Sequence, residues 1–184
     1  MKKINEIDLY YWDLIEKLLR EQRHDFLNEI QIIFGYIKLN KIDKAVEYIN
    51  KVSYSAKVCS KLSNLNCIDL YLILNEKLRK CKELGINVNF EVYSVGERKD
   101  FLGKNILKSL NYFEKAIDIV LDFVYNNSNF EEYIFYIEET PECFALKVDL
   151  SYFNDISCLE KKLNLSCGEF YLCKDYLIYE IEFN

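Results

Sequence analysis

The feature that most constrains this chain is a long helical pattern in its first third. From Trp12 to Ile37 apolar residues recur at steps of three, four and seven, and no proline interrupts the run. Such spacing places these residues on one face of an α-helix. The segment "KLNKID", residues 38–43, then breaks the pattern. One helix is therefore expected to end there.

A second apolar series follows this break. Its members are separated by three and four residues, which again indicates a helix with one apolar face: Ile42, Ala45, Ile49, Val52, Ala56 and Cys59. Since the connection is short, we expect a hairpin of antiparallel helices over residues 1–66. Two helices leave both apolar faces half exposed, so we expect two copies of the chain to pair as a four-helix bundle. The alternative is that the C-terminal part folds back over the hairpin.

Residues 67–184 have a different pattern, which predicts a separate α+β domain. Helical spacing recurs at 68–85, 106–124 and 156–163, and strand-like segments lie at 86–95, 132–139, 143–152, 169–173 and 176–183. The order of a strand, a helix and then several strands favours an antiparallel or mixed sheet with helices on one face. The fold class expected for the whole chain is therefore α+β.

Composition excludes several classes of function. The net charge of −6 argues against nucleic acid as a main partner. No apolar stretch approaches the ~20 residues of a membrane span, and acidic residues interrupt the N-terminal apolar runs, unlike a secretory signal. Seven cysteines without a C-x-x-C pair, and a single histidine, offer little for a zinc site. We expect a cytoplasmic protein with free thiols, no metal of its own and no membrane partner.

The only histidine, His24, lies in the middle of the first predicted helix. Arg20, His24, Asn28 and Gln31 are separated by four, four and three residues, so they share a polar stripe beside the apolar face. An exposed imidazole is a competent nitrogen nucleophile at cellular pH and can accept a phosphoryl group. Arg20 or Arg23 could balance the phosphoryl charge, and Asn28 could bind the group or orient a water. A lone surface histidine usually has no role. Spacing alone does not decide whether His24 is such a residue or a phosphoryl acceptor.

Residues 18–50 resemble the sporulation initiation phosphotransferase B family, whose helical hairpin is shared by citrate- and malate-type sensor histidine kinases. In the stretch "RHDFLNEIQIIFGYIKLNKIDKAVEYI", polar and glycine positions agree with the family pattern as well as apolar ones. The resemblance implies a dimeric four-helix bundle and makes His24 the phosphoryl acceptor, with Arg23, Asp25 and Asn28 as matched neighbours. Phe26 replaces a common tryptophan and keeps its packing role.

The resemblance implies a phosphorelay phosphotransferase. It would accept a phosphoryl group from an aspartate of one response regulator onto His24 and pass it to a second regulator, in control of sporulation initiation. The receiver domain would hold the required Mg²⁺, so no cofactor is expected on this chain. Residues 67–184 resemble a degenerate histidine-kinase ATPase domain: no two glycines are one residue apart, so no Gly-x-Gly turn exists. Lys115 occupies the position of the kinase magnesium asparagine. We therefore expect no ATP-dependent autokinase activity.

Two other functions stay open at this point. In some sensor kinases an acidic residue after the histidine and a nearby amide orient water against the receiver's acyl phosphate, and Asp25 and Asn28 have that spacing. The chain would then be a response-regulator phosphatase. The third possibility is a non-catalytic protein that sequesters a receiver domain. The sequence leaves open the donor, the acceptor, the direction of phosphoryl flow and any signal ligand.

Overall fold

A computed structural model of the chain describes residues 6–101, 106–126, 131–153, 156–163 and 168–183. The chain packs as two units, Met1–Ala56 and Lys57–Asn184. The side chains of Trp12 and Cys158, and all of Cys167, lie outside the described part. No disulfide bond joins the five cysteines whose side chains are described: Cys59, Cys67, Cys81, Cys143 and Cys173.

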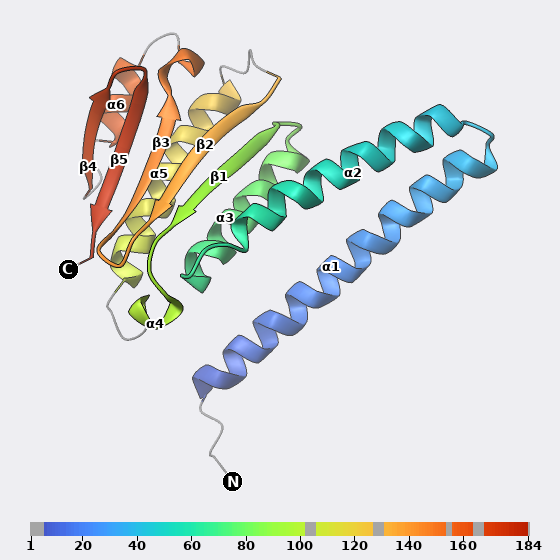
Figure 1. The fold of residues 1–184 in the computed structure, drawn as a ribbon, viewed down its shortest axis with the longest axis horizontal. Helices are drawn as coiled ribbons and strands as arrows, with labels where there is room; N and C mark the ends of the chain where they lie inside the picture. The colour runs from blue at the N-terminus through green and yellow to red at the C-terminus, as the bar shows by residue number, and fades with distance from the viewer. Residues whose placement is uncertain (1–5, 102–105, 127–130, 154–155, 164–167, 184) are drawn as a thin grey trace. The chain divides into compact units, whose positions relative to one another are not determined.

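The first unit holds most of the predicted helical hairpin, and the last turns of its second helix, residues 57–62, belong to the second unit. Helix α1 covers Glu6–Lys38 and helix α2 covers Ile42–Leu62, and the chain reverses between them (Figure 1). Asn40 adopts a positive φ of 55°, which asparagine tolerates better than most residues. The N–H of Lys41 donates to the carbonyl of Tyr36 at 2.9 Å and closes the end of α1. The rings of Tyr36 and Tyr48 meet across the turn with centroids 6.2 Å apart.

The apolar face of this hairpin is open in the described part of a single chain. Phe26 is 60% exposed, although its spacing places it in the apolar series. We call the large exposed hydrophobic members of the two series the hairpin stripe: Leu19, Phe26, Ile30, Ile37, Ile42 and Ile49. Burying one such side chain is worth roughly 1.5–3 kcal/mol. An open stripe of this length therefore favours a further packing partner.

The second unit is a mixed five-stranded sheet with helices on one face (Figure 1). The strand order is β1-β2-β3-β5-β4. Only the β1–β2 pair is parallel. The strands are β1 Val88–Ser94, β2 Tyr133–Glu139, β3 Cys143–Asp149, β4 Glu169–Cys173 and β5 Tyr176–Glu182. The helices are α3 Ile68–Glu83, α4 Arg98–Phe101, α5 Leu107–Asn126, the 3₁₀ turn η1 Leu150–Tyr152 and α6 Ser157–Leu163. The predicted α+β class is confirmed.

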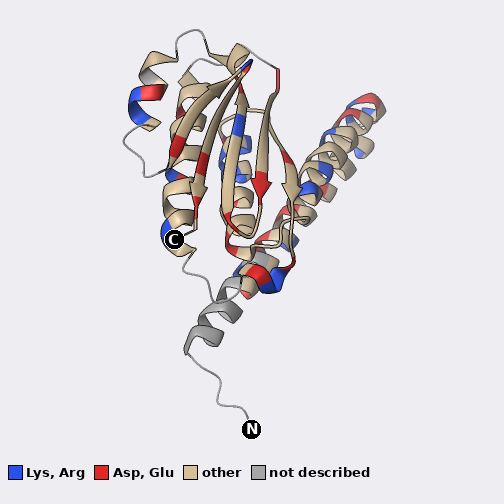
Figure 2. Ribbon diagram, turned by 60° about the vertical axis from the view of Figure 1, so that its left-hand side comes forward, with Lys and Arg blue, Asp and Glu red and all other residues tan. Residues whose placement is uncertain are grey.

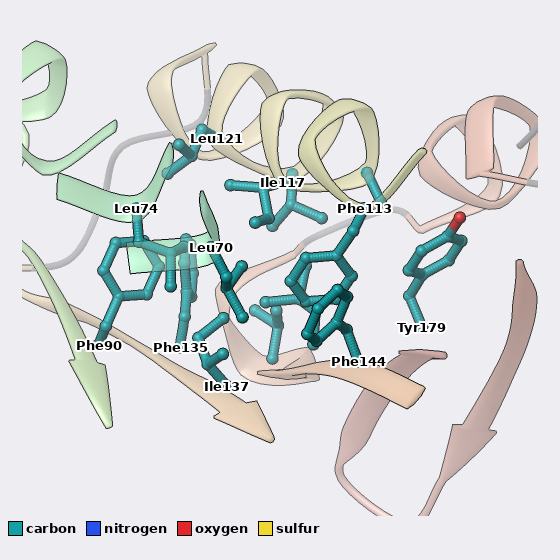
Figure 3. Close-up of a cluster of buried hydrophobic side chains, with 14 of the residues drawn as sticks. Leu70, Leu74, Phe90, Phe113, Ile117, Leu121, Phe135, Ile137, Phe144 and Tyr179 are labelled. Atoms are coloured by element: carbon teal, nitrogen blue, oxygen red, sulfur yellow. The ribbon is translucent and has the colours of Figure 1, made fainter. Parts of the chain in front are cut away.

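The core of this unit lies between the sheet and its helices (Figure 3). Strand residues alternate, so every second side chain points inward, as Phe135 and Ile137 do on β2. Phe113 of α5 packs on Phe144 of β3, with ring centroids 5.6 Å apart. Leu62, the last residue of α2, is fully buried in the same cluster. Residues 57–62 at the end of α2 thus form part of the second unit, while the domain boundary expected after residue 66 stays a prediction.

A buried carboxylate fixes the connector between α2 and α3. Glu139, the last residue of β2, is 0% exposed. It accepts hydrogen bonds from the N–H of Cys67 at 2.6 Å, from the N–H of Asn66 at 2.7 Å and from the hydroxyl of Ser94. The Asn66 amide in turn donates to Ser94 Oγ at 2.8 Å. Glu139 thus supplies the acceptor for the N–H of the buried Cys67 and for that of the half-buried Asn66.

Candidate functional site

His24 lies near the middle of α1, and its side chain is 74% exposed. Its Nδ1 is 3.2 Å from Nδ2 of Asn28, one helical turn along, and 3.5 Å from Oδ1 of Asp25. Both neighbours approach the same ring nitrogen. Within the described residues no hydrogen bond engages Nε2. The pair at positions 24 and 28 follows the i, i+4 neighbour rule.

Two arginines precede the histidine and differ in their partners. Arg20 donates to Glu16 Oε1 at 2.6 Å, and both side chains are exposed. An exposed pair of this kind contributes about 0–1 kcal/mol, so it is easily exchanged for another anion. Arg23 is exposed and forms no ion pair with a described residue. The stripe of Arg20, His24, Asn28 and Gln31 is thus exposed along its length, and Arg23 is the cation available beside it.

Lys115, which the sequence resemblance aligns with the kinase magnesium asparagine, lies on the exposed side of α5. Its Nζ is 5.5 Å from the ring centroid of Tyr112, a distance at which an ammonium is attracted to an aromatic face. A positive charge at this point repels a divalent cation. Among the described residues, no three or more His, Cys, Asp or Glu side chains gather as metal ligands do.

Sequence reasoning missed two buried charged residues, Lys77 and Glu139. Lys77 of α3 contacts Glu114 at 2.8 Å and Asp118 at 2.7 Å, both on α5. Burial alone would lower the pKa of Lys77, but its hydrogen bonds to Asp118 and Glu114 outweigh that cost and raise it. Residues 70, 74, 77 and 81 are spaced as one buried face, which is the signal that could have found Lys77. The inward alternation of β2 gives the same signal for Glu139.

Comparisons with known proteins support the resemblance at the hairpin. Residues 5–65 match the family described as Sensor_kinase_SpoOB-type, alpha-helical domain. The chain is 34% identical over 109 residues to sporulation initiation phosphotransferase B of Bacillus subtilis (strain 168), a match that spans 54% of this chain and 53% of that protein. It is 30% identical over 113 residues to sensor protein CitS of Halalkalibacterium halodurans, spanning 56% of this chain and 20% of that protein. The resemblance predicted from the sequence is confirmed over the matched part.

Among solved structures, similarity is weaker. Acinetobacter baumannii histidine kinase AdeS matches with a TM-score of 0.36 and 9% identity, covering 88% of this chain and 97% of that one. Histidine kinase ThkA, solved in complex with response regulator protein TrrA, matches with a TM-score of 0.33 and 14% identity over 96% of this chain and 64% of that one. Separately, no helix within the described residues combines the length and apolar character needed to cross a bilayer.

Proposed function

We propose that this protein is a phosphotransferase of a two-component phosphorelay. His24 would accept a phosphoryl group from the aspartyl phosphate of one receiver domain and pass it to an aspartate of a second, in control of sporulation initiation. One observation carries the proposal: the exposed His24, with Nε2 unengaged within the described residues, lies inside the segment that matches the SpoOB-type domain. The relative named as a sporulation initiation phosphotransferase supports the same reaction class.

The arrangement around Nδ1 suits transfer at Nε2. In the tautomer with hydrogen on Nδ1, Nε2 has a free lone pair that can attack phosphorus. The N–P bond forms as the bond between phosphorus and the aspartate oxygen breaks, and the receiver's carboxylate leaves. The ring gains positive charge in this step, and the Asp25 carboxylate, 3.5 Å from Nδ1, would stabilise it. Asn28 would present its amide oxygen to Nδ1–H after a half-turn of its amide group.

The arginines would balance the phosphoryl charge. Arg23 is exposed beside His24 and has no ion pair to break within the described residues. A guanidinium presents several N–H donors in one plane, which matches phosphoryl oxygens. Mg²⁺ held by the receiver domain would supply the remaining charge balance, so the reaction places no demand for a metal on this chain.

We also propose that the hairpin pairs with a second copy as a four-helix bundle. The six side chains of the hairpin stripe are open in the described part of one chain. At roughly 1.5–3 kcal/mol for each side chain buried, a two-fold contact gains from twelve such groups. Receiver domains would then meet His24 on the outer, polar side of the bundle. The expected location of such a relay is the cytoplasm.

We propose that transfer does not use ATP. The sequence resemblance supports this, because it aligns Lys115 with the asparagine that holds magnesium in a kinase, and a lysine would not bind the cation. On the same helix, Glu114 and Asp118 are held by the buried Lys77 of α3. These ion pairs join α3 to α5, so the two carboxylates contribute to packing within the second unit. The unit would serve as scaffold or docking surface for partner proteins.

One observation favours a second candidate function. Asn28 Nδ2 and Asp25 Oδ1 lie 3.2 Å and 3.5 Å from Nδ1 of His24. The two side chains could orient a water molecule instead of supporting nucleophilic attack by His24. The protein would then be a response-regulator phosphatase that hydrolyses the aspartyl phosphate directly. The non-catalytic alternative, a protein that only sequesters a receiver domain, predicts binding without any change in phosphate flow.

A transfer assay separates these functions. A receiver domain carrying radiolabelled aspartyl phosphate is mixed with the full chain and a second, unlabelled receiver. The proposal predicts label on the second receiver with the native chain and with Gln31→Ala, a matched change on the same polar stripe, and none with His24→Ala. Release of inorganic phosphate that survives His24→Ala would indicate the phosphatase instead. Label that stays on the first receiver would leave only sequestration. Labelling of the chain by radiolabelled ATP alone would overturn its independence of nucleotide.

A further inference from the structure

The sheet face opposite the helices carries a hollow of about 400 Å³. Helices α3 and α5 contact the sheet from its other face. On this side Lys61 of α2 meets Asn89 and Glu91 of β1, while Tyr136 and Glu138 of β2 are exposed. Most charged positions on the strands are acidic (Figure 2). Lys147 is the single basic residue within the five strands. This side of the sheet is thus a negatively charged surface with a depression in it.

Strand register explains where the hollow lies. Glu138 of β2, Ala145 of β3 and Glu180 of β5 are direct partners across the sheet. The small Ala145 forms the floor, and a carboxylate stands on either side of it. The two glutamates are two strand spacings apart, about 10 Å between backbones. A cation above Ala145 could therefore approach both carboxylates at once.

Three tyrosines border the same hollow: Tyr93, Tyr136 and Tyr171. All three are exposed, and Tyr93 is 65% exposed. Burial and a hydrogen bond to Glu180 raise the pKa of Tyr171, so its phenol stays neutral at cellular pH. Neutral aromatic faces attract ammonium groups and, more often, planar guanidinium groups, which also stack on the ring.

The surface already holds one cation in this way. The Nζ of Lys147 is 3.9 Å from the ring centroid of Tyr176 and 5.7 Å from that of Tyr136. The carboxylates that line the hollow differ in whether another side chain already contacts them. Glu91 pairs with Lys61, and Glu180 accepts from the Tyr171 hydroxyl at 3.2 Å. Glu138 is exposed and forms no ion pair or hydrogen bond with a described residue.

We propose that this hollow is a docking site for an arginine-bearing segment of a partner protein, with the guanidinium between Glu138 and Glu180 and against the tyrosine rings. Charge complementarity selects this occupant, because anionic lipid, nucleic acid or an acidic protein surface is repelled by the same carboxylates. A second copy of this chain, with its net charge of −6, is disfavoured for the same reason. The site is independent of the chemistry at His24, so either proposal can fail alone.

The test is a titration of the full chain with the blocked peptide Gly-Arg-Gly-Arg-Gly, followed by amide chemical shifts. Saturable shifts are expected in β2, β3 and β5. Glu138→Gln and Glu180→Gln should each weaken binding about two- to fivefold, as expected for partly exposed ion pairs. Ala145→Leu fills the floor without changing charge and should weaken binding as well. The matched control is Glu83→Gln on α3, which removes the same charge away from the sheet and should leave the affinity unchanged.

Three results would overturn the proposal. The first is the absence of saturable shifts at millimolar peptide. The second is equal binding of the same peptide with citrulline in place of arginine, which would show that charge has no part. The third is that Glu83→Gln weakens peptide binding as much as the Glu→Gln changes at the hollow. That result would show that binding depends only on the net charge of the chain. Thermal unfolding of each variant establishes that it is folded, and if Ala145→Leu does not fold, the two Glu→Gln variants decide alone.

Discussion

The connector between α2 and α3 gives the sharpest stability prediction. Glu139→Ala removes the acceptor for the N–H groups of Asn66 and Cys67 and for the hydroxyl of Ser94. Cys67 is 2% exposed, so water cannot easily replace the lost acceptor there. Asn66 and Ser94 are half-buried, and water can partly replace it at those two positions.

The expected loss follows from these three donors. A hydrogen bond to a charged group contributes roughly 1.5–3 kcal/mol, and a buried donor left without a partner costs about 1–3 kcal/mol. With full loss at Cys67 and partial loss at the two half-buried donors, we expect the free energy of unfolding of the second unit to fall by about 3–5 kcal/mol. Effects of that size arise from few mechanisms, and a broken buried network is one of them.

Urea unfolding followed by near-ultraviolet circular dichroism measures this loss, and amide hydrogen exchange locates it. The amides of Asn66 and Cys67 should exchange much faster in Glu139→Ala. The matched control is Glu138→Ala, the preceding residue on the opposite, exposed side of β2, which should change stability by less than about 0.5 kcal/mol. Native stability and native protection of Cys67 in Glu139→Ala would refute the assigned role.

Three further outcomes are expected. Ile30→Asp places a charge in the hairpin stripe of both copies and should shift the protein to monomer in sedimentation velocity, because a buried unpaired charge costs several kcal/mol; a dimer of undiminished affinity would count against the bundle. Arg23→Ala should slow phosphoryl transfer several-fold at low salt, with the difference shrinking as salt rises, because screening removes the same attraction; a salt-independent deficit would point to a structural role. Burial raises the pKa of the Cys67 and Cys81 thiols from 9.0 to about 11. The unfolded chain then loses these protons first, so stability is unaffected below about pH 9 and falls toward pH 11, by up to about 1.4 kcal/mol per pH unit for each thiol. Urea unfolding across that range should show a shallower slope in Cys81→Ala, and parallel slopes would contradict the assignment.

Sequence periodicity predicted the elements of this fold well, because each has a clear pattern. The apolar steps of α1 and α2 and the alternation of β2, β3 and β5 follow directly from side-chain direction in helices and strands. Gly85 marks the end of α3 and adopts a φ of +74°, which glycine allows without strain. The four-residue helix α4 was not predicted, since a single turn has no period to detect.

The site was predicted in part. The i, i+4 rule places Asn28 beside His24, and the structure brings their side chains to 3.2 Å. Periodicity could not single out His24, because an exposed polar position on a helix has no packing requirement; only the resemblance did so. The hollow over Ala145 depends on which strands are neighbours, and the order β1-β2-β3-β5-β4 is a long-range property that local pattern does not contain.

The central claim is that His24 carries a phosphoryl group supplied by another protein. The most direct measurement is to mix the full chain with a phosphorylated receiver domain, quench at alkaline pH and locate the added phosphoryl group by fragment mass spectrometry. The account predicts one modification, on His24, stable in base and lost in acid. A chain that stays unmodified while the receiver loses its phosphate, or a modification on any other residue, would contradict it.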